Sequence, residues 1–182
     1  MDALVKAGVV FFGAVALLNM VETWALGKPD KAVKEIYNET VVEFKKHYNL
    51  ISAPKLIQSE CDGVLAKYYP HRNAICISNH MATYDIKKKS VMQFAIAHEL
   101  AHAYLRHDYG DLGREEHADM MARNVIFNIK DYNKQQLKDW LLMYDSIDDG
   151  TQTGHPSWYN RARLISGEIT KYPIESWRKK RK

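Results

Sequence analysis

The residues of this sequence best suited to chemistry are His98-Glu99-Leu100-Ala101-His102, the HELAH motif. A helix has about 3.6 residues per turn, so the two histidines lie on one face and can bind a single Zn²⁺ from the same side. Glu99 lies between them, where its carboxylate can reach a zinc-activated water without being a ligand. Zinc lowers the pKa of such a water, and the glutamate can accept its proton. The pattern predicts a hydrolytic zinc site, with His98 and His102 as ligands and Glu99 as general base.

A third metal ligand is expected downstream, because a catalytic zinc usually has three protein ligands and one open position. After a turn-rich run come Glu115 and Asp119, which are four residues apart and share a helix face. We expect a second helix, from about Arg114 to Ile129, that brings Glu115 to the metal as a ligand. Asp119 would then orient a ligand histidine without touching the metal. Glu116 and His117 point elsewhere and are the alternatives.

Three motifs together resemble those of the gluzincin peptidases. They are HELAH, the following Arg106-His107, and the Arg-Glu-x-x-Ala-Asp run at Arg114–Asp119. The sequence is most similar to the CaaX prenyl-protease and heat-shock membrane-protease group, and the resemblance covers residues 74–165. That group also has a His-Pro-Ser element with an arginine six residues after the histidine. His155 and Arg161 match it here, which implies that these two approach the site from the last helix and stabilise the developing oxyanion.

The sequence departs from that group in two respects. It is small, and the short spacing between HELAH and the glutamate helix leaves no room for the membrane spans often inserted there. It is also similar to minimal gluzincins that cleave phage and stress repressors. The resemblance implies an α+β, zincin-like (minigluzincin) domain, with a small, mostly antiparallel sheet packed on the active-site helix and several further helices. It implies a zinc metalloendopeptidase that holds one Zn²⁺ per chain and hydrolyses a protein or peptide substrate.

Short strands are expected before the active-site helix. Apolar and β-branched residues between turn signals predict strands at residues 55–60, 63–69 and 74–78. The last strand precedes the HELAH helix, and we expect it to be the edge of the sheet. An edge strand can bind an extended peptide substrate through its unpaired backbone groups. The candidate substrate-binding residues are therefore Ile75, Cys76, Ile77 and Ser78.

Capping signals place the helices. Asp30 should cap a helix that runs to about His47, and Ser90 should cap the active-site helix, which ends near residue 107. Asn133 and Gln136 resemble a capping box for a later helix.

The last helix should begin with Pro156 at its first position and His155 as its N-cap. Tyr172-Pro173 should end it, because proline cannot continue a helix.

Composition supports one catalytic domain, at residues 28–177. A chain of 182 residues with 46% hydrophobic and 26% charged residues has globular rather than disordered character. Cys61 and Cys76 are the two cysteines, too few for a disulfide scaffold. We expect both to be free thiols, as in a reducing compartment.

The amino-terminal segment, residues 1–27, is apolar enough to suggest a membrane helix. Residues 3–26 are long enough to span a bilayer, although Lys6, Asn19 and Glu22 interrupt them. We expect a single-pass anchor, and a cleaved signal peptide or a helix buried in the fold are the alternatives. Lys28, Lys31 and Lys34 follow the segment, against Lys6 before its apolar run, so the positive-inside rule places the catalytic domain in the cytoplasm. A cleaved signal would instead give an exported enzyme.

The basic residues are concentrated in a tail. Residues 178–182 are all Lys or Arg, and these five exceed the formal net charge of +4, so the rest of the chain is nearly neutral. Such a tail can bind an anionic membrane or nucleic acid, or be a solvated end. The body has no basic face interleaved with aromatic residues, and nucleic acid is therefore not an expected partner.

Two other functions remain open at this stage. The chain could be a membrane-tethered zinc-binding module without proteolysis, although such a module would not need Glu99. Alternatively, HELAH could be accidental in a helical, membrane-associated adaptor. Zinc content separates the adaptor from the others, and protease activity with Glu99→Gln as control separates the enzyme from the binding module.

Overall fold

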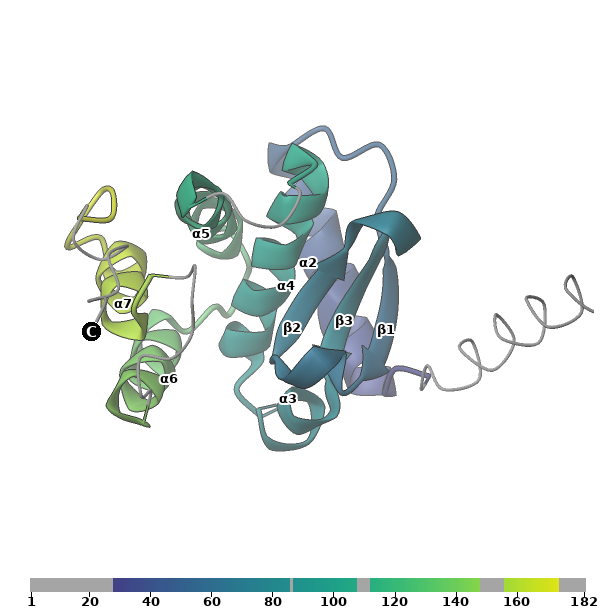
Figure 1. Cartoon of the computed structure of the whole chain (residues 1–182), viewed down its shortest axis with the longest axis horizontal. Coiled ribbons are helices and arrows are strands. Elements are labelled where there is room, and N and C mark those ends of the chain that lie inside the picture. Colours follow the sequence, from purple (N-terminus) through teal and green to yellow (C-terminus); the bar gives the residue numbers. More distant parts are fainter. Residues whose placement is uncertain (1–27, 86, 108–111, 148–155, 174–182) are drawn as a thin grey trace, which may run out of the picture.

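A small three-stranded sheet lies beside a long, buried helix, and further helices cover the other side of that helix (Figure 1). The computed structural model describes residues 28–85, 87–107, 112–147 and 156–173. These ranges form an α+β fold with a mixed sheet, β1 (Lys55–Ser59), β2 (Ala66–Tyr69) and β3 (Ala74–Ser78). The helices are α2 (Lys31–His47), α3 (Asn79–Tyr84), α4 (Lys89–Leu105), α5 (Leu112–Ile126), α6 (Lys134–Ile147) and α7 (Trp158–Ser166).

The strand order is β1-β3-β2, which corrects two expectations. Strand β3 lies in the centre of the sheet, so Ile75, Cys76, Ile77 and Ser78 do not form an edge. All five residues of β3 are buried, as expected for a continuous apolar strand with a neighbour on each side. β3 pairs parallel with β1 and antiparallel with β2, so the sheet is mixed rather than mostly antiparallel. The edge strand beside α4 is β2 (Figure 1).

The two cysteines form a disulfide, which corrects the expectation of free thiols. Cys61 and Cys76 are bonded, with their Cα atoms 5.7 Å apart. Cys61 begins a short 3₁₀ turn, Cys61–Gly63, that occupies the start of the strand expected at residues 63–69. Gly63 ends this turn at φ +82°, a left-handed conformation that glycine adopts without strain. The disulfide therefore ties this turn to the middle of β3.

Helix α2 matches its predicted range, and Asp30 is at the N-cap position, although its side chain makes no capping hydrogen bond. It packs against α4 and α5 and buries one face at helical spacing. The buried residues of that face are Val33, Ile36, Tyr37, Thr40, Val41 and Phe44.

Helix α4 is central, between the sheet and α5 (Figure 1), and most of its residues are buried. Ser90 does not cap it, because the N-cap is Lys88 and the Ser90 hydroxyl accepts a hydrogen bond from the Asn133 backbone N–H at 2.8 Å. Asn133 does cap α6, since its Oδ1 accepts from the Gln136 N–H at 2.9 Å. The reciprocal bond of a capping box is replaced, because Gln136 Oε1 accepts from the Ser90 N–H at 3.4 Å. These contacts join the starts of α4 and α6.

Three boundaries, in two helices, differ from the predicted ones. Helix α5 ends at Ile126, three residues earlier than expected. Helix α7 begins after Ser157, whose hydroxyl accepts from the Asn160 N–H at 3.3 Å, so Pro156 precedes the cap and is not the first helical residue. The helix ends at Gly167 in a left-handed conformation, before Tyr172-Pro173. The capping hydrogen bond that the Ser157 hydroxyl accepts therefore determines where α7 begins, and the position of Pro156 does not.

Several expectations fall outside the described residues: the amino-terminal segment 1–27, His155 and the basic tail 178–182. Within the described ranges, none of the helices has both the length and the apolar character needed to cross a bilayer.

Candidate metal centre

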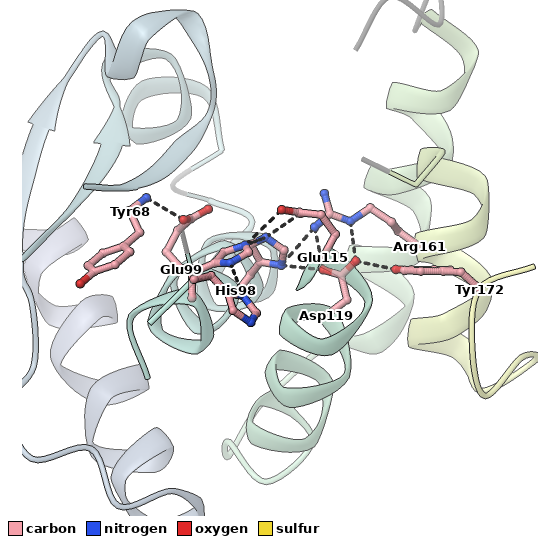
Figure 2. Close-up of polar contacts among 9 residues, drawn as sticks. Tyr68, His98, Glu99, Glu115, Asp119, Arg161 and Tyr172 are labelled. Atoms are coloured by element: carbon pink, nitrogen blue, oxygen red, sulfur yellow. Dashed lines mark hydrogen bonds and ion pairs between the residues drawn. The ribbon is translucent and has the colours of Figure 1, made fainter. Parts of the chain in front are cut away.

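Three side chains that the sequence predicts as metal ligands converge between α4 and α5. Nε2 of His98 and Nε2 of His102 lie 3.0 Å apart on α4. Glu115 of α5 faces both, with Oε2 3.3 Å from His98 Nε2 and Oε1 3.3 Å from His102 Nε2 (Figure 2). The ligand atoms of the three residues all lie within 4.8 Å of one another. The packing of α5 against α4 thus brings a residue 13 positions beyond His102 to the same site.

The geometry and chemistry of this triad fit a zinc ion. Bonds of about 2.0–2.1 Å to a tetrahedral ion place neighbouring ligand atoms about 3.3 Å apart, and the observed separations are 3.0, 3.3 and 3.3 Å. His98 is buried, and His102 and Glu115 are half-buried. Two imidazole nitrogens and a carboxylate pointing at one another need a shared cation or proton, since their lone pairs otherwise repel. Two histidines and one glutamate are also the ligands of one class of hydrolytic zinc site.

Behind His98 lies a fully buried carboxylate, that of Asp119. Its Oδ1 is 2.7 Å from His98 Nδ1. Its two oxygens also accept from Arg161, with Nε donating at 2.8 Å and Nη2 at 2.6 Å. The Tyr172 hydroxyl donates to Oδ2 at 2.5 Å (Figure 2). The contact expected between Asp119 and a ligand histidine is therefore present, and it turns the Nε2 of His98 toward Glu115.

Opposite charges stabilise the buried group of His98, Asp119 and Arg161. Burial alone would lower the pKa of His98, but the charge and hydrogen bond of Asp119 outweigh it and raise the pKa to about 10 in the absence of a metal. Burial alone would raise the pKa of Asp119, but the positive charges of Arg161 and His98 hold it well below its usual range. Asp119 is therefore ionised and paired, as a buried charge must be.

His107 contacts His102, the second histidine of the triad, and the sequence did not reveal this contact. Its Nδ1 is 3.0 Å from Nδ1 of His102, and the two ring centroids are 5.2 Å apart. Burial, together with the electrostatic influence of His102, Arg114 and His117, lowers the pKa of His107 to about 4. A neutral His107 can accept a hydrogen bond from the Nδ1–H that His102 carries when its Nε2 binds a metal. His107 follows the end of α4, so helical spacing could not predict this contact.

Glu99 lies on the side of α4 that faces the sheet. It is 8% exposed, and its Oε2 accepts a hydrogen bond from the backbone N–H of Tyr68 at 2.7 Å (Figure 2). Tyr68 belongs to β2, so the strand beside this carboxylate is β2 and not β3. Because main-chain groups carry no side-chain signal, Tyr68 could not be identified from the sequence.

The remaining candidates lie elsewhere. Arg161 is buried, and its guanidinium contacts the Asp119 carboxylate and lies 3.2 Å from Nδ1 of His98, on the side of that ring away from the ligand nitrogen. Glu116 is half-buried and His117 is exposed, and neither belongs to the triad. Of the three candidates, Glu115 is therefore the one that converges with the two histidines, as predicted.

No family model, curated protein or solved structure matches this chain. What the protein does is therefore inferred from the side chains of this centre.

Proposed function

We propose that this protein is a zinc-dependent metalloendopeptidase that hydrolyses peptide bonds with water. One observation carries the proposal: the ligand atoms of His98, His102 and Glu115 lie within 4.8 Å of one another, next to a glutamate that is not a ligand. A purely structural zinc site is closed by four protein ligands, whereas a catalytic one keeps an open position. Three converging ligands within the described ranges fit the catalytic kind.

His98, His102 and Glu115 would hold the ion. When bound, Zn²⁺ supplies a Lewis acid that lowers the pKa of water and polarises a carbonyl group. Asp119 and His107 fix the two imidazoles through their Nδ1 atoms, so each Nε2 points into the centre. Glu115 adds a negative charge that favours a divalent cation.

Glu99 is the proposed general base. It removes a proton from the attacking water and then delivers that proton to the leaving amine. The Tyr68 N–H donates to Oε2 of Glu99, which holds the carboxylate between α4 and β2. The proximity of β2 supports an approach of an extended peptide from this side of the centre.

We propose that the substrate lies along β2, the edge strand. The Tyr68 N–H points away from β3, because it donates to Glu99. Backbone groups on that side of an edge strand can pair with an added strand. In this proposal the substrate-binding edge strand is β2, whereas β3 was expected from the sequence.

Arg161 acts as a positioning residue in this mechanism. Its guanidinium donates to both oxygens of Asp119, which holds His98, so its effect on the metal passes through that pair. His155 stays the candidate donor to the developing oxyanion.

Membrane association through residues 3–26 also stays a proposal, and two signals disagree on the side of the membrane. The lysines after the segment favour a cytoplasmic domain. The Cys61–Cys76 disulfide favours an oxidising compartment, because cytosolic thiols are kept reduced. We give the disulfide more weight, since it is part of the fold, and propose that the catalytic domain is on the exported side.

Cleavage of an unbiased peptide library by the zinc-loaded full chain tests the function, with mass spectrometry to locate new termini. Glu99→Gln is the matched control, because it keeps the shape and all three ligands but loses the base. We expect cleavage by the wild type and a loss of at least about 10³-fold in Glu99→Gln. Bound zinc without cleavage by either protein would favour a zinc-binding module instead. Equal cleavage by both would contradict the role of Glu99.

A further inference from the structure

A cavity of about 480 Å³ opens between the C-terminal end of α4, the edge strand β2 and the loop that follows α2. We call it the β2 cavity. Its lining includes the loop at residues 49–52, Tyr68 of β2, and Ala103, Tyr104 and Arg106 at the end of α4. Its volume lies within the range of about 300–1,000 Å³ that is typical of ligand sites.

The β2 cavity adjoins the proposed base. Tyr68 lines it and also donates its backbone N–H to Glu99 at 2.7 Å. Ala103 is four residues after Glu99, so it lies one turn along the same side of α4. An extended peptide on β2 that passes Glu99 would therefore place a neighbouring side chain at this cavity.

The lining has one charged residue, Arg106. The other lining residues contribute amide, hydroxyl, aromatic and aliphatic groups, and none is acidic. Arg106 is exposed, and in the part of the chain that the structure describes its guanidinium is not paired with a carboxylate. A cavity lined by this cation and by Tyr68 and Tyr104 suits a ligand with a short aliphatic stem and a terminal carboxylate.

The backbone of Arg106 is a second, independent observation. It is the C-cap of α4 and adopts φ 52° and ψ 43°, a left-handed conformation that glycine or asparagine adopts more easily. The left-handed backbone conformation is unfavourable for an arginine, and residues held in such strained conformations are concentrated at functional sites. A purely structural explanation also exists, because a cation near a helix C-terminus interacts favourably with the helix dipole.

We infer that the β2 cavity is a substrate subsite for an acidic side chain, whose carboxylate pairs with Arg106. The inference rests on the proposed function, which identifies the ligand as a peptide. It predicts an endopeptidase that prefers Glu or Asp at one position near the cleaved bond.

Two measurements on the zinc-loaded full chain test this inference. Short alanine- and leucine-rich peptides carry Glu, Gln or Lys at each position in turn. Their cleavage by the wild type gives kcat/KM, and their binding to Glu99→Gln, followed by fluorescence anisotropy, gives Kd without turnover. We expect Glu to be preferred over Gln at one position by about 10-fold, as for a hydrogen bond to a charged group.

Arg106→Gly is the decisive variant, because glycine suits the left-handed backbone and removes the cation. We expect it to abolish the Glu preference while its melting temperature stays the same or rises. Arg106→Glu should reverse the preference toward Lys. Lys34→Ala, which removes an exposed charge from α2, is the control for net charge and should keep the Glu preference.

The possible outcomes separate this inference from the proposed function. Binding with a Glu preference that Arg106→Gly removes, but without cleavage by the wild type, supports the subsite and contradicts the peptidase. Cleavage without an acidic preference leaves the peptidase and overturns the subsite. A preference that survives in Arg106→Gly, or a lowered melting temperature as its sole effect, also overturns the subsite and leaves Arg106 as a helix cap.

Discussion

The two sides of α4 differ in how completely their polar groups are enclosed. On the α5 side, the fully buried Asp119 contacts His98, Arg161 and Tyr172 at 2.5–2.8 Å. On the β2 side, Glu99 accepts a hydrogen bond from the backbone N–H of Tyr68, a residue that also lines an open cavity. Figure 2 shows Glu99 and Tyr68 on one side of His98 and the buried ionic group on the other. Helix α4 therefore has one side on which the polar groups are enclosed and fixed, and another side with room for a ligand.

The difference is what the proposed catalytic function would require. Metal ligands must be held by partners that are themselves fixed, and a buried polar network stabilises only when every member is satisfied. A substrate must enter and leave, so its side of the site stays accessible. Changes on the α5 side should therefore reduce metal binding and stability. Changes on the β2 side should alter turnover or substrate choice while the metal is retained.

Removal of a ligand should have the largest effect. The purified protein should bind about one Zn²⁺ per chain, and His98→Ala or His102→Ala should abolish this. Elemental analysis by mass spectrometry after dialysis measures the metal. Glu115→Ala should lose more zinc than Glu116→Ala, its matched control on the same helix. Equal zinc in the two glutamate variants would show that Glu115 is not a ligand.

Breaking the buried ionic group should have the next largest effect. Asp119→Ala leaves Arg161 buried without its carboxylate, which should cost about 3–5 kcal/mol of unfolding free energy. It should also weaken zinc binding by about 10- to 100-fold, because His98 loses its partner. Urea unfolding and chelator competition measure the two quantities. Unchanged zinc affinity would mean that Asp119 supports only the fold.

Opening the disulfide should test the sheet side of the molecule. Cys61 and Cys76 are 15 residues apart in the sequence, and closing a loop of that size stabilises a fold by about 3 kcal/mol. The paired variant Cys61→Ala/Cys76→Ala should lose about this much unfolding free energy. Its zinc affinity should be unchanged, because the disulfide contacts none of the ligands. A parallel loss of zinc affinity would show that the two sides of α4 are coupled.

The smallest effect should come from His107. His107→Phe removes the contact at Nδ1 of His102 and should weaken zinc binding by about 10-fold, with little change in melting temperature. His107→Asn keeps a hydrogen-bonding group near the position of Nδ1 and should restore most of the affinity. Chelator competition on both variants gives the comparison. Identical zinc affinities in the two variants would show that the hydrogen bond between His107 and His102 does not contribute to zinc binding.

The metal centre could be predicted because its pattern is local. His98 and His102 share a face through helical spacing alone, and the same spacing places Glu115 and Asp119 on one face of the second helix. Asn133 likewise capped α6, because a side-chain oxygen bonds the backbone N–H three residues later.

The sheet could not be predicted to the same degree. The range of β3 was correct, but its central place depends on β1 and β2 pairing on both of its sides. The disulfide depends on the same pairing, because the turn that carries Cys61 meets Cys76 only after the strands assemble. Neither feature has a signal within a few residues of the chain.

The sequence by itself therefore determined the triad of His98, His102 and Glu115 and the helices that present it, since helical spacing sets which residues of each helix share a face. Tertiary structure decided which strand borders Glu99, that His107 contacts His102, and that Arg161 contacts Asp119. These contacts join residues from different elements or beyond a helix end, where direction is set by packing and no longer by the period of the backbone.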